Sequence, residues 1–524
     1  MRRLLAGLLL FTAQPALAAN WIEAETTHFR IISSGDEAGL RRFAERLENF
    51  HGLLRLATGA SESSRSLVKV RVYLVADIGA VQKYFGDQNS AVAGFYTARE
   101  DGALAVVPRS TGSGSFTGEV VLNHEYAHHF MLQYTPAAYP SWYVEGFAEI
   151  ASTASFERKG AITFGKAAQH RQHELDGGMS YPVPSLLDGS YLNDQMKGRG
   201  WSYGDAWLLS HYLTFSDTRR GQFRDYLNAV NAGKPLAEAA KVFGDLGELQ
   251  REVSRYLAGR SFPYRAVPIE AVKAGPIAVR DLDPAQEALI DFVIEFKRKT
   301  WLPREDDADA EQDKKDAAKD KAAGKETFEQ RLAKAKRERD EWLAKLEAVA
   351  NKYADHPAGW LLLADARCTI QQFQACAEAA DRALALAPTS QRGQVRKAEA
   401  LLGLAKDLPA DKREASVKQA RTMLLSANAA DRSDPLALEF FYRSYAVLGR
   451  PADADGLRAL ASVVDLVPQM ASTRLILAQE YMQRGRLQNA RYILRPLAFS
   501  PHQNGASRLA RKLLDQVEAK LAGG

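Results

Sequence analysis

The sequence contains little cysteine, no long apolar run and almost no excess of one charge. Two cysteines among 524 residues are too few for a disulfide-rich scaffold or for a zinc site built from thiolates. Beyond its first residues, no stretch has the roughly 18 consecutive apolar residues of a membrane-spanning helix. Lysine and arginine (69) nearly balance aspartate and glutamate (64), and no basic stripe is interleaved with aromatic residues. This argues against nucleic acid as a partner.

The overall composition is that of an ordinary globular protein, with 46% hydrophobic and 25% charged residues. At roughly 100 to 200 residues per domain, a chain of this length holds about three units. Each of these units is long enough to bury a hydrophobic core of its own.

The first residues have the features of a secretory signal peptide. Two arginines are followed by an apolar segment over residues 4–11 and by an Ala-Leu-Ala triplet that ends at Ala18. The apolar segment is too short to span a bilayer, and the small residues are typical of a cleavage site. We expect cleavage after Ala18, which removes residues 1–18 and lowers the net charge from +5 to +3. The mature protein is then periplasmic or secreted and has no integral membrane segment.

A charged segment interrupts the middle of the chain. Between Arg304 and Glu326 lie nine acidic and six basic residues, with almost no apolar side chain. Such a stretch cannot bury enough apolar surface to offset the entropy lost on ordering. It predicts a linker over residues 304–326, inside a bridging segment that covers residues 261–339.

After the linker the sequence repeats itself. The clearest copy places Trp360, Leu363, Ala364, Ala383 and Pro388 at positions 4, 7, 8, 27 and 32 of a 34-residue frame. Weaker copies begin near Pro435 and Ala471, and a degenerate copy lies between residues 390 and 434. These copies resemble tetratricopeptide repeats. They predict an all-α solenoid of about four repeats over residues 340–520, which would dock a protein partner or hold substrate.

Both cysteines fall in the first of these copies, at the end of one predicted helix and the start of the next. In an oxidising compartment, Cys368 and Cys376 could form one disulfide. They could equally be two small buried thiols, and the sequence leaves the two possibilities open.

Between the signal peptide and residue 260 the hydrophobic pattern alternates between strands and helices. The predicted strands cover residues 21–33, 67–76, 93–97 and 103–107, and a predicted amphipathic helix covers residues 37–58. A further helix, which ends before Pro136, contains the motif H-E-x-x-H.

The spacing of this motif has a mechanical consequence. Residues four apart on a helix lie one turn above each other, so His124 and His128 point to one place and can bind a single zinc ion. Glu125 is rotated by about 100° from His124, which places its carboxylate beside the metal and within reach of a bound water.

Catalytic zinc normally has three protein ligands, and the next helix offers a third. That helix is predicted to start at Pro140 and Ser141, with Ser141 able to cap it. Its residues Glu145 and Glu149 are again four apart on one face, and sixteen residues separate His128 from Glu145. This gap suffices for a helix end, a reversal and the return of a second helix.

Together these motifs resemble those of the gluzincins, zinc metallopeptidases of the thermolysin and M1 aminopeptidase type. They also resemble bacterial peptidase-MA-like proteins, which carry a W-x-x-E-G segment shortly after the H-E-x-x-H helix. The resemblance covers residues 20–260, and it implies an α+β zincin-like catalytic domain that precedes the all-α repeats.

The resemblance also implies the site residues. Zn2+ would be the cofactor, with His124, His128 and Glu145 as its ligands, and Glu125 would be the general base. Glu149 corresponds to an acidic residue that orients a ligand histidine in such enzymes. Because the gap before Glu145 is shorter than in the best-known members, Glu149 stays open as an alternative ligand.

A tyrosine that opens a later helix stabilises the oxyanion in the M1-like enzymes. The corresponding segment here is W-S-Y-G-D-A-W, which implies Tyr203 as the oxyanion donor. The match is partial, and Tyr203 could instead be a core tyrosine. The other histidines give no comparable signal: His170 and His173 have no matching carboxylate pattern, and His28 and His51 have none at all.

The sequence therefore predicts an exported zinc metallopeptidase that hydrolyses a peptide or protein substrate with a zinc-activated water. The substrate would lie along an edge strand formed by residues 103–107. An alternative is a catalytically inactive zincin-like scaffold whose repeats mediate protein–protein interaction. A third, weaker possibility is an amide or cell-wall hydrolase with the same zinc chemistry.

Overall fold

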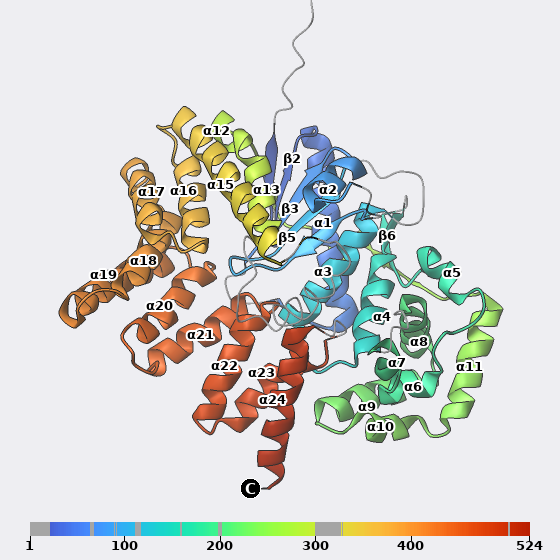
Figure 1. The fold of residues 1–524 in the computed structure, drawn as a ribbon. Coiled ribbons are helices and arrows are strands. Elements are labelled where there is room, and N and C mark those ends of the chain that lie inside the picture. Colours follow the sequence, from blue (N-terminus) through green and yellow to red (C-terminus); the bar gives the residue numbers. More distant parts are fainter. Residues whose placement is uncertain are drawn as a thin grey trace, which may run out of the picture.

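The computed structural model describes residues 21–298, 326 and 328–523, apart from gaps at 63–67, 89, 91, 110–116, 158–159, 197–201 and 501–503. The predicted signal peptide and nearly all of the predicted linker lie outside these residues. Within the described chain, a mixed part that contains every strand is followed by an array of helices that lies along one side of it (Figure 1). No helix in the described part of the chain combines the length and the hydrophobicity that a membrane crossing needs.

The first part is built on a six-stranded sheet in the order β4-β5-β3-β2-β1-β9. Its strands are β1 (Ile22–Glu25), β2 (Phe29–Ser33), β3 (Val70–Val75), β4 (Phe95–Thr97), β5 (Leu104–Pro108) and β9 (Ala278–Asp281). The three neighbours β2, β3 and β5 run parallel, and each of the other strands pairs antiparallel with its neighbour. The predicted strand at 21–33 is a two-stranded hairpin, because a turn at residues 26–28 divides it. The helix predicted at 37–58 is α1 (Glu37–Thr58).

The prediction that residues 103–107 form the sheet edge is wrong. Strand β5 lies between β3 and β4, so the short antiparallel β4 forms the edge. Ala105 and Val107 face α1 and α3 (Gly118–Tyr134), while Leu104 and Val106 face α2 (Ile78–Phe85) and α13 (Ile290–Arg298). A strand covered on both faces is apolar throughout, which is why the run of apolar residues does not indicate an edge.

The segment predicted to bridge the domains supplies parts of the first domain. Strand β8 (Arg265–Pro268) joins β6 (Ser155–Glu157) and β7 (Ala161–Phe164) in a second sheet, and β9 extends the main sheet beside β1. Both strands are short and largely exposed, so neither has the alternating pattern that sequence analysis depends on.

Helices fill the remainder of the first part. They are α4 (Ser141–Ser152), α5 (Gln172–Leu175), α6 (Val183–Asp188), α7 (Tyr191–Met196), α8 (Tyr203–Phe215), α9 (Arg220–Asn231), α10 (Leu236–Ala239), α11 (Leu246–Gly259) and α12 (Pro284–Ala288). Helix α4 packs against both α3 and α8, and these three helices carry all the predicted site residues.

The second part is an all-α array of helix pairs. Its helices are α15 (Phe328–Lys352), α16 (Pro357–Thr369), α17 (Phe373–Leu386), α18 (Gln391–Ala405), α19 (Ala410–Ala430), α20 (Pro435–Val447), α21 (Ala454–Leu466), α22 (Ala471–Gln483), α23 (Leu487–Ala498) and α24 (Gly505–Ala522). The four predicted repeats are the pairs α16/α17, α18/α19, α20/α21 and α22/α23. Each helix packs on the next, and α16 also contacts α18, which in turn contacts α20. This is the stacking expected of a repeat solenoid.

The two cysteines form a disulfide in this array. Cys368 at the end of α16 is bonded to Cys376 in α17, so the bond links the two helices of the first repeat. Both residues are buried among the small side chains of the repeat.

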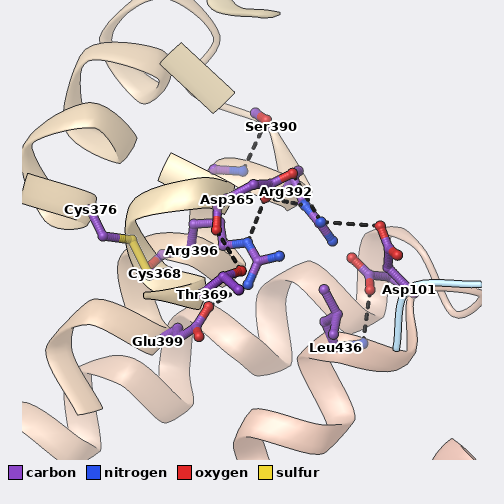
Figure 2. Close-up of polar contacts among 12 residues, drawn as sticks. Asp101, Asp365, Cys368, Thr369, Cys376, Ser390, Arg392, Arg396, Glu399 and Leu436 are labelled. Carbon is purple, nitrogen blue, oxygen red and sulfur yellow. Dashed lines mark hydrogen bonds and ion pairs between the residues drawn. A yellow bond between two sulfur atoms is a disulfide. The ribbon is translucent and has the colours of Figure 1, made fainter. Parts of the chain in front are cut away.

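A buried network of charges fixes the start of the array to the sheet (Figure 2). Asp101, in the loop before β5, lies 3.0 Å from Arg71 of β3, 2.5 Å from Lys297 of α13 and 3.2 Å from Arg392 of α18. Arg392 also pairs with Asp365 of the preceding repeat at 2.8 Å. One carboxylate therefore joins the sheet, a covering helix and the repeats.

The far end of the array contacts the first part as well. Gln469 donates to the ring of His129 on α3 at 3.0 Å, and Gln133 donates to the carbonyl of Asp465 at 2.9 Å. Arg495 of α23 donates to the carbonyls of Val230 and Asn231. The array is thus held at both ends and spans one side of the α/β part.

Candidate metal centre

Helix α3 positions the H-E-x-x-H motif. It begins at Gly118, where the Thr117 hydroxyl accepts the Val120 amide at 3.2 Å, and it ends at Tyr134, before Pro136. His124 and His128 lie one turn apart on one face, and their Nε2 atoms are 3.1 Å from each other. The helix therefore aims both ring nitrogens at one point.

Helix α4 brings the third group to that point. A Cβ added at Gly146 would lie 1.9 Å from Ser210 Oγ and 2.3 Å from the carbonyl oxygen of Ala206 on α8. Only glycine allows this close crossing of α4 and α8, which buries the neighbouring Glu145 to 1% exposure. Ser141 does not cap α4 as predicted; its hydroxyl donates to the carbonyl of Phe499 in the array at 3.0 Å.

The three predicted ligand atoms form a compact triangle. Glu145 Oε2 is 3.3 Å from His124 Nε2 and 3.4 Å from His128 Nε2, and the two nitrogens are 3.1 Å apart. Tetrahedral zinc with ligand bonds of about 2.0 to 2.1 Å holds neighbouring ligands roughly 3.3 to 3.4 Å apart. Two imidazoles and a carboxylate at this spacing fit a zinc ion both in chemistry and in size.

Glu149 occupies a different position from Glu145. Its Oε1 is 3.3 Å from Nδ1 of His124, the nitrogen on the opposite side of the ring from the triangle. His170 Nε2 at 2.8 Å and Arg171 at 2.7 Å hold the same carboxylate. Glu149 therefore orients His124 from behind, as carboxylates do for metal-binding histidines.

Sequence analysis missed His170 and Arg171 as members of this site. They lie in a short 3-10 turn over residues 169–171, in a polar stretch without periodicity. Only their approach to Glu149 in the folded chain reveals their role, so no local signal could have identified them.

The electrostatics of the site favour a cation. Burial opposes protonation of His124, but Glu145 and Glu149 outweigh it and raise its pKa to about 10. Burial likewise opposes ionisation of the two glutamates, and their histidine and arginine neighbours nevertheless hold both pKa values well below the usual range. Two buried, ionised carboxylates thus face the histidines, where a positive ion is stabilised.

The two predicted catalytic groups, Glu125 and Tyr203, both lie close to His124, Glu125 as its neighbour on α3 and Tyr203 through a ring contact. Glu125 is half-buried, and the ring of Tyr203 meets that of His124 edge-on at 6.2 Å. Arg171 lies 4.4 Å above the Tyr203 ring, so the residue that holds Glu149 also supports this tyrosine. Burial, followed by the charge of Glu145, raises the pKa of Tyr203 to about 12, and Glu125 contributes to the same shift. The tyrosine hydroxyl is therefore a neutral hydrogen-bond donor at physiological pH.

The opposite face of α3 connects the motif to the rest of the molecule. The buried ring of His129 bonds to the hydroxyl of Tyr96 on the edge strand β4 at 2.9 Å and to Gln469 of the array at 3.0 Å. His129 turns away from the triangle, because one step along a helix is about 100°. It joins the motif helix to both the sheet edge and the repeats.

Comparisons with known proteins gave matches among solved structures alone. No protein-family model matches the chain, and no curated protein matches it. Among solved structures, it is similar to TTC0263, a thermophilic TPR protein of Thermus thermophilus, with 19% identity, a TM-score of 0.30, and coverage of 34% of this chain and 90% of that one. It is also similar to MamA of Desulfovibrio magneticus RS-1 (16% identity, TM-score 0.23, 41% and 95% covered) and to yeast Tom70 (8%, 0.25, 76% and 70%). These scores carry no functional argument.

Proposed function

We propose that the chain is an exported zinc metallopeptidase of the gluzincin kind. The observation that carries the proposal is the triangle of His124, His128 and Glu145, with edges of 3.1 to 3.4 Å, next to the half-buried Glu125. This set of residues matches a catalytic rather than a structural zinc site, because catalytic sites have three protein ligands and an open position. The contact of Glu149 with His124 agrees with this match.

The three residues of the triangle would hold the Zn2+ ion. When bound, the ion would supply Lewis-acid chemistry, polarising a carbonyl and lowering the pKa of a water. Glu149 keeps His124 in the tautomer that presents Nε2 to the metal, since its carboxylate accepts the proton on Nδ1.

Two further side chains would carry the chemistry of hydrolysis. Glu125 would accept a proton from the attacking water and return it to the leaving amine. Tyr203 would donate its hydroxyl hydrogen to the oxygen that gains negative charge. Strand β4 is an edge of the main sheet, and an extended peptide substrate would add there as a further strand.

The disulfide and the sequence of residues 1–18 support export. Disulfides persist in oxidising compartments such as the periplasm and are rare in the cytosol, and the first repeat contains one. The first residues have the order of a signal peptide. Cleavage after Ala18 and a periplasmic or secreted location are part of the proposal.

A second candidate function is that of a binding scaffold. The helix-pair array supports it directly, because repeat solenoids present extended surfaces to protein partners. In this alternative the zincin-like part would be inactive and the repeats would be the working part.

Metal content and hydrolysis together test the proposal. The wild type is expected to bind one zinc ion more than His128→Ala, and to hydrolyse casein in a manner abolished by a chelator and restored by Zn2+. His173→Ala, which alters an exposed histidine, is the matched control and should retain both properties. Equal zinc in the wild type and His128→Ala would contradict the metal site. Zinc binding without hydrolysis of casein or peptides would favour the scaffold.

Replacing Tyr203 by phenylalanine tests the oxyanion role. We expect kcat to fall by about 100- to 1,000-fold, in the range typical of a lost oxyanion donor, with KM and zinc content nearly unchanged. The ring, which contacts His124 and Arg171, is preserved. Tyr264→Phe, at an exposed tyrosine, is the control. An unchanged kcat would make Tyr203 a packing residue only.

A further inference from the structure

A second group of metal-ligand side chains lies in the N-terminal part, apart from the site described above. His28 precedes β2, His51 lies in α1, and Glu62 follows α1. One ligand atom from each of the three lies within 4.8 Å of the others. The three residues are far apart in the sequence. The spacing of His28 and His51 matches no metal-binding motif.

The two rings present the same nitrogen to Glu62. His28 Nε2 is 3.0 Å from Glu62 Oε1, and His51 Nε2 is 3.9 Å from the same oxygen. The rings are stacked with centroids 3.7 Å apart and planes 25° from parallel. Both Nε2 atoms therefore lie on the side of Glu62, and binding one ion would require the stacked rings to tilt so that their Nε2 lone pairs converge.

The other nitrogen of each ring is already held. Nδ1 of His28 bonds to the buried carboxylate of Glu48 at 2.7 Å. Nδ1 of His51 bonds to the hydroxyl of Tyr126 on α3 at 2.8 Å. Histidines that bind metals almost always have this outer support, which fixes the ring and leaves Nε2 for the ion.

A buried nitrogen without a hydrogen bond lies in the same cluster. Nε2 of His51 is inaccessible to solvent and makes no hydrogen bond within the described part of the chain, and His51 itself is 2% exposed. A buried polar atom in this state costs free energy unless a partner is bound.

From these contacts we infer that His28, His51 and Glu62 form a second site for a divalent transition-metal ion, with Zn2+ as the ion that best suits two imidazoles and a carboxylate. Ligands of tetrahedral zinc lie roughly 3.3 to 3.4 Å apart. The separations from Glu62 Oε1 would need to change by less than about 1 Å to reach this value, and Glu62 is 43% exposed. Arg55 holds the other oxygen of Glu62 at 2.5 Å, and Oε1, which bonds to His28 Nε2, is the oxygen that the ion would take.

The ion would have a structural role. It would cross-link the β1–β2 hairpin, α1 and the segment after α1, with Tyr126 of the motif helix behind it. Because a ligand that binds only the folded chain stabilises it, Zn2+ should raise the thermal midpoint through this site independently of hydrolysis.

Counting zinc in the wild type and in five variants tests the inference. After equilibration with Zn2+ and removal of free ion, the expected contents are about two per chain in the wild type, one in Glu62→Gln, one in His128→Ala and none in the double variant. Glu62 is exposed, so its variant should fold; Glu37→Gln, at an exposed glutamate of α1, should retain two. His51→Asn provides a second test from inside the cluster.

The outcomes separate the two sites. If Glu62→Gln and His51→Asn, both folded, bind as much zinc as the wild type, the second site is overturned whatever His128→Ala shows. If His128→Ala loses no zinc but Glu62→Gln loses one ion, the second site stands and the proposed catalytic site fails. Zn2+ should raise the thermal midpoint of His128→Ala but not that of the double variant with Glu62→Gln and His128→Ala. A Zn2+-dependent rise in the double variant would also overturn the inference.

Discussion

Replacing Glu125 by glutamine is expected to lower kcat/KM for peptide hydrolysis by about 100- to 10,000-fold, the contribution typical of a general base. The amide keeps the size of the side chain but cannot accept the proton of the attacking water. Because Glu125 is not part of the ligand triangle, zinc content should stay at the wild-type value. Metal analysis and a peptide-cleavage assay on the same preparation measure both quantities.

The control for this variant is Glu119→Gln on the same helix. Glu119 lies in the first turn of α3 and pairs with Arg46 at 3.1 Å, a partly exposed pair that contributes little to stability. Its activity should remain close to that of the wild type. If Glu125→Gln keeps full activity, the general base is another group; if it loses zinc as well, Glu125 has a role in metal binding that the triangle does not include.

The variant Asp101→Asn is expected to destabilise the protein by about 3 to 5 kcal/mol, the cost typical of removing one partner from a buried ion pair. Asp101 is the common partner of Arg71, Lys297 and Arg392. Without its charge, three cations from the sheet, a covering helix and the repeats face one another at close range. Thermal unfolding and limited proteolysis should show that the repeats are released from the first part before it unfolds.

The same network predicts a dependence on pH. Burial opposes ionisation of Asp101, but its three cations outweigh burial and hold its pKa well below the usual range. An acid whose pKa is lowered on folding stabilises the fold above its unfolded pKa of about 4, and the stabilisation is lost as the pH falls toward the lowered value. The difference in thermal midpoint between the wild type and Asp101→Asn should therefore be largest near neutral pH and shrink in acid.

Two further variants make this result specific. Asp217→Asn alters an aspartate that is 94% exposed and should unfold like the wild type. Arg392→Ala removes the array's partner of Asp101, so its effect and that of Asp101→Asn should be non-additive in the double variant. Additive effects would show that the pair does not couple the repeats to the sheet.

Local patterns in the sequence predicted the helices that carry the site. Periodicity, spacing and helix-ending residues act over one or two turns. They predicted the helix over residues 37–58, the motif helix that ends before Pro136, and the first repeat around Trp360. The side-by-side placement of His124 and His128 belongs to the same class, since it depends only on the pitch of a helix.

Contacts between distant segments had no such signal. Three features join residues that are not neighbours in sequence: the order of β4 and β5, the pairing of β9 with β1, and the contact of Arg171 with Glu149. The same holds for the pair His28 and His51, which sequence analysis passed over. Each depends on how whole elements pack, and side-chain patterns within one element do not encode it.

By itself, then, the sequence determined the identity of the chemical groups: a pair of histidines on one helix turn, two glutamates on the next helix, and a repeat of helix pairs behind a charged segment. Only the tertiary structure decided between the glutamates. Helix α4 packs against α8 at Gly146 and against α3 with its glutamates, and this packing places Glu145 at Nε2 of both histidines and Glu149 at Nδ1 of His124. The reason is geometric: residues four apart share a face of their helix, but the helix that packs against that face selects which of them reaches the centre.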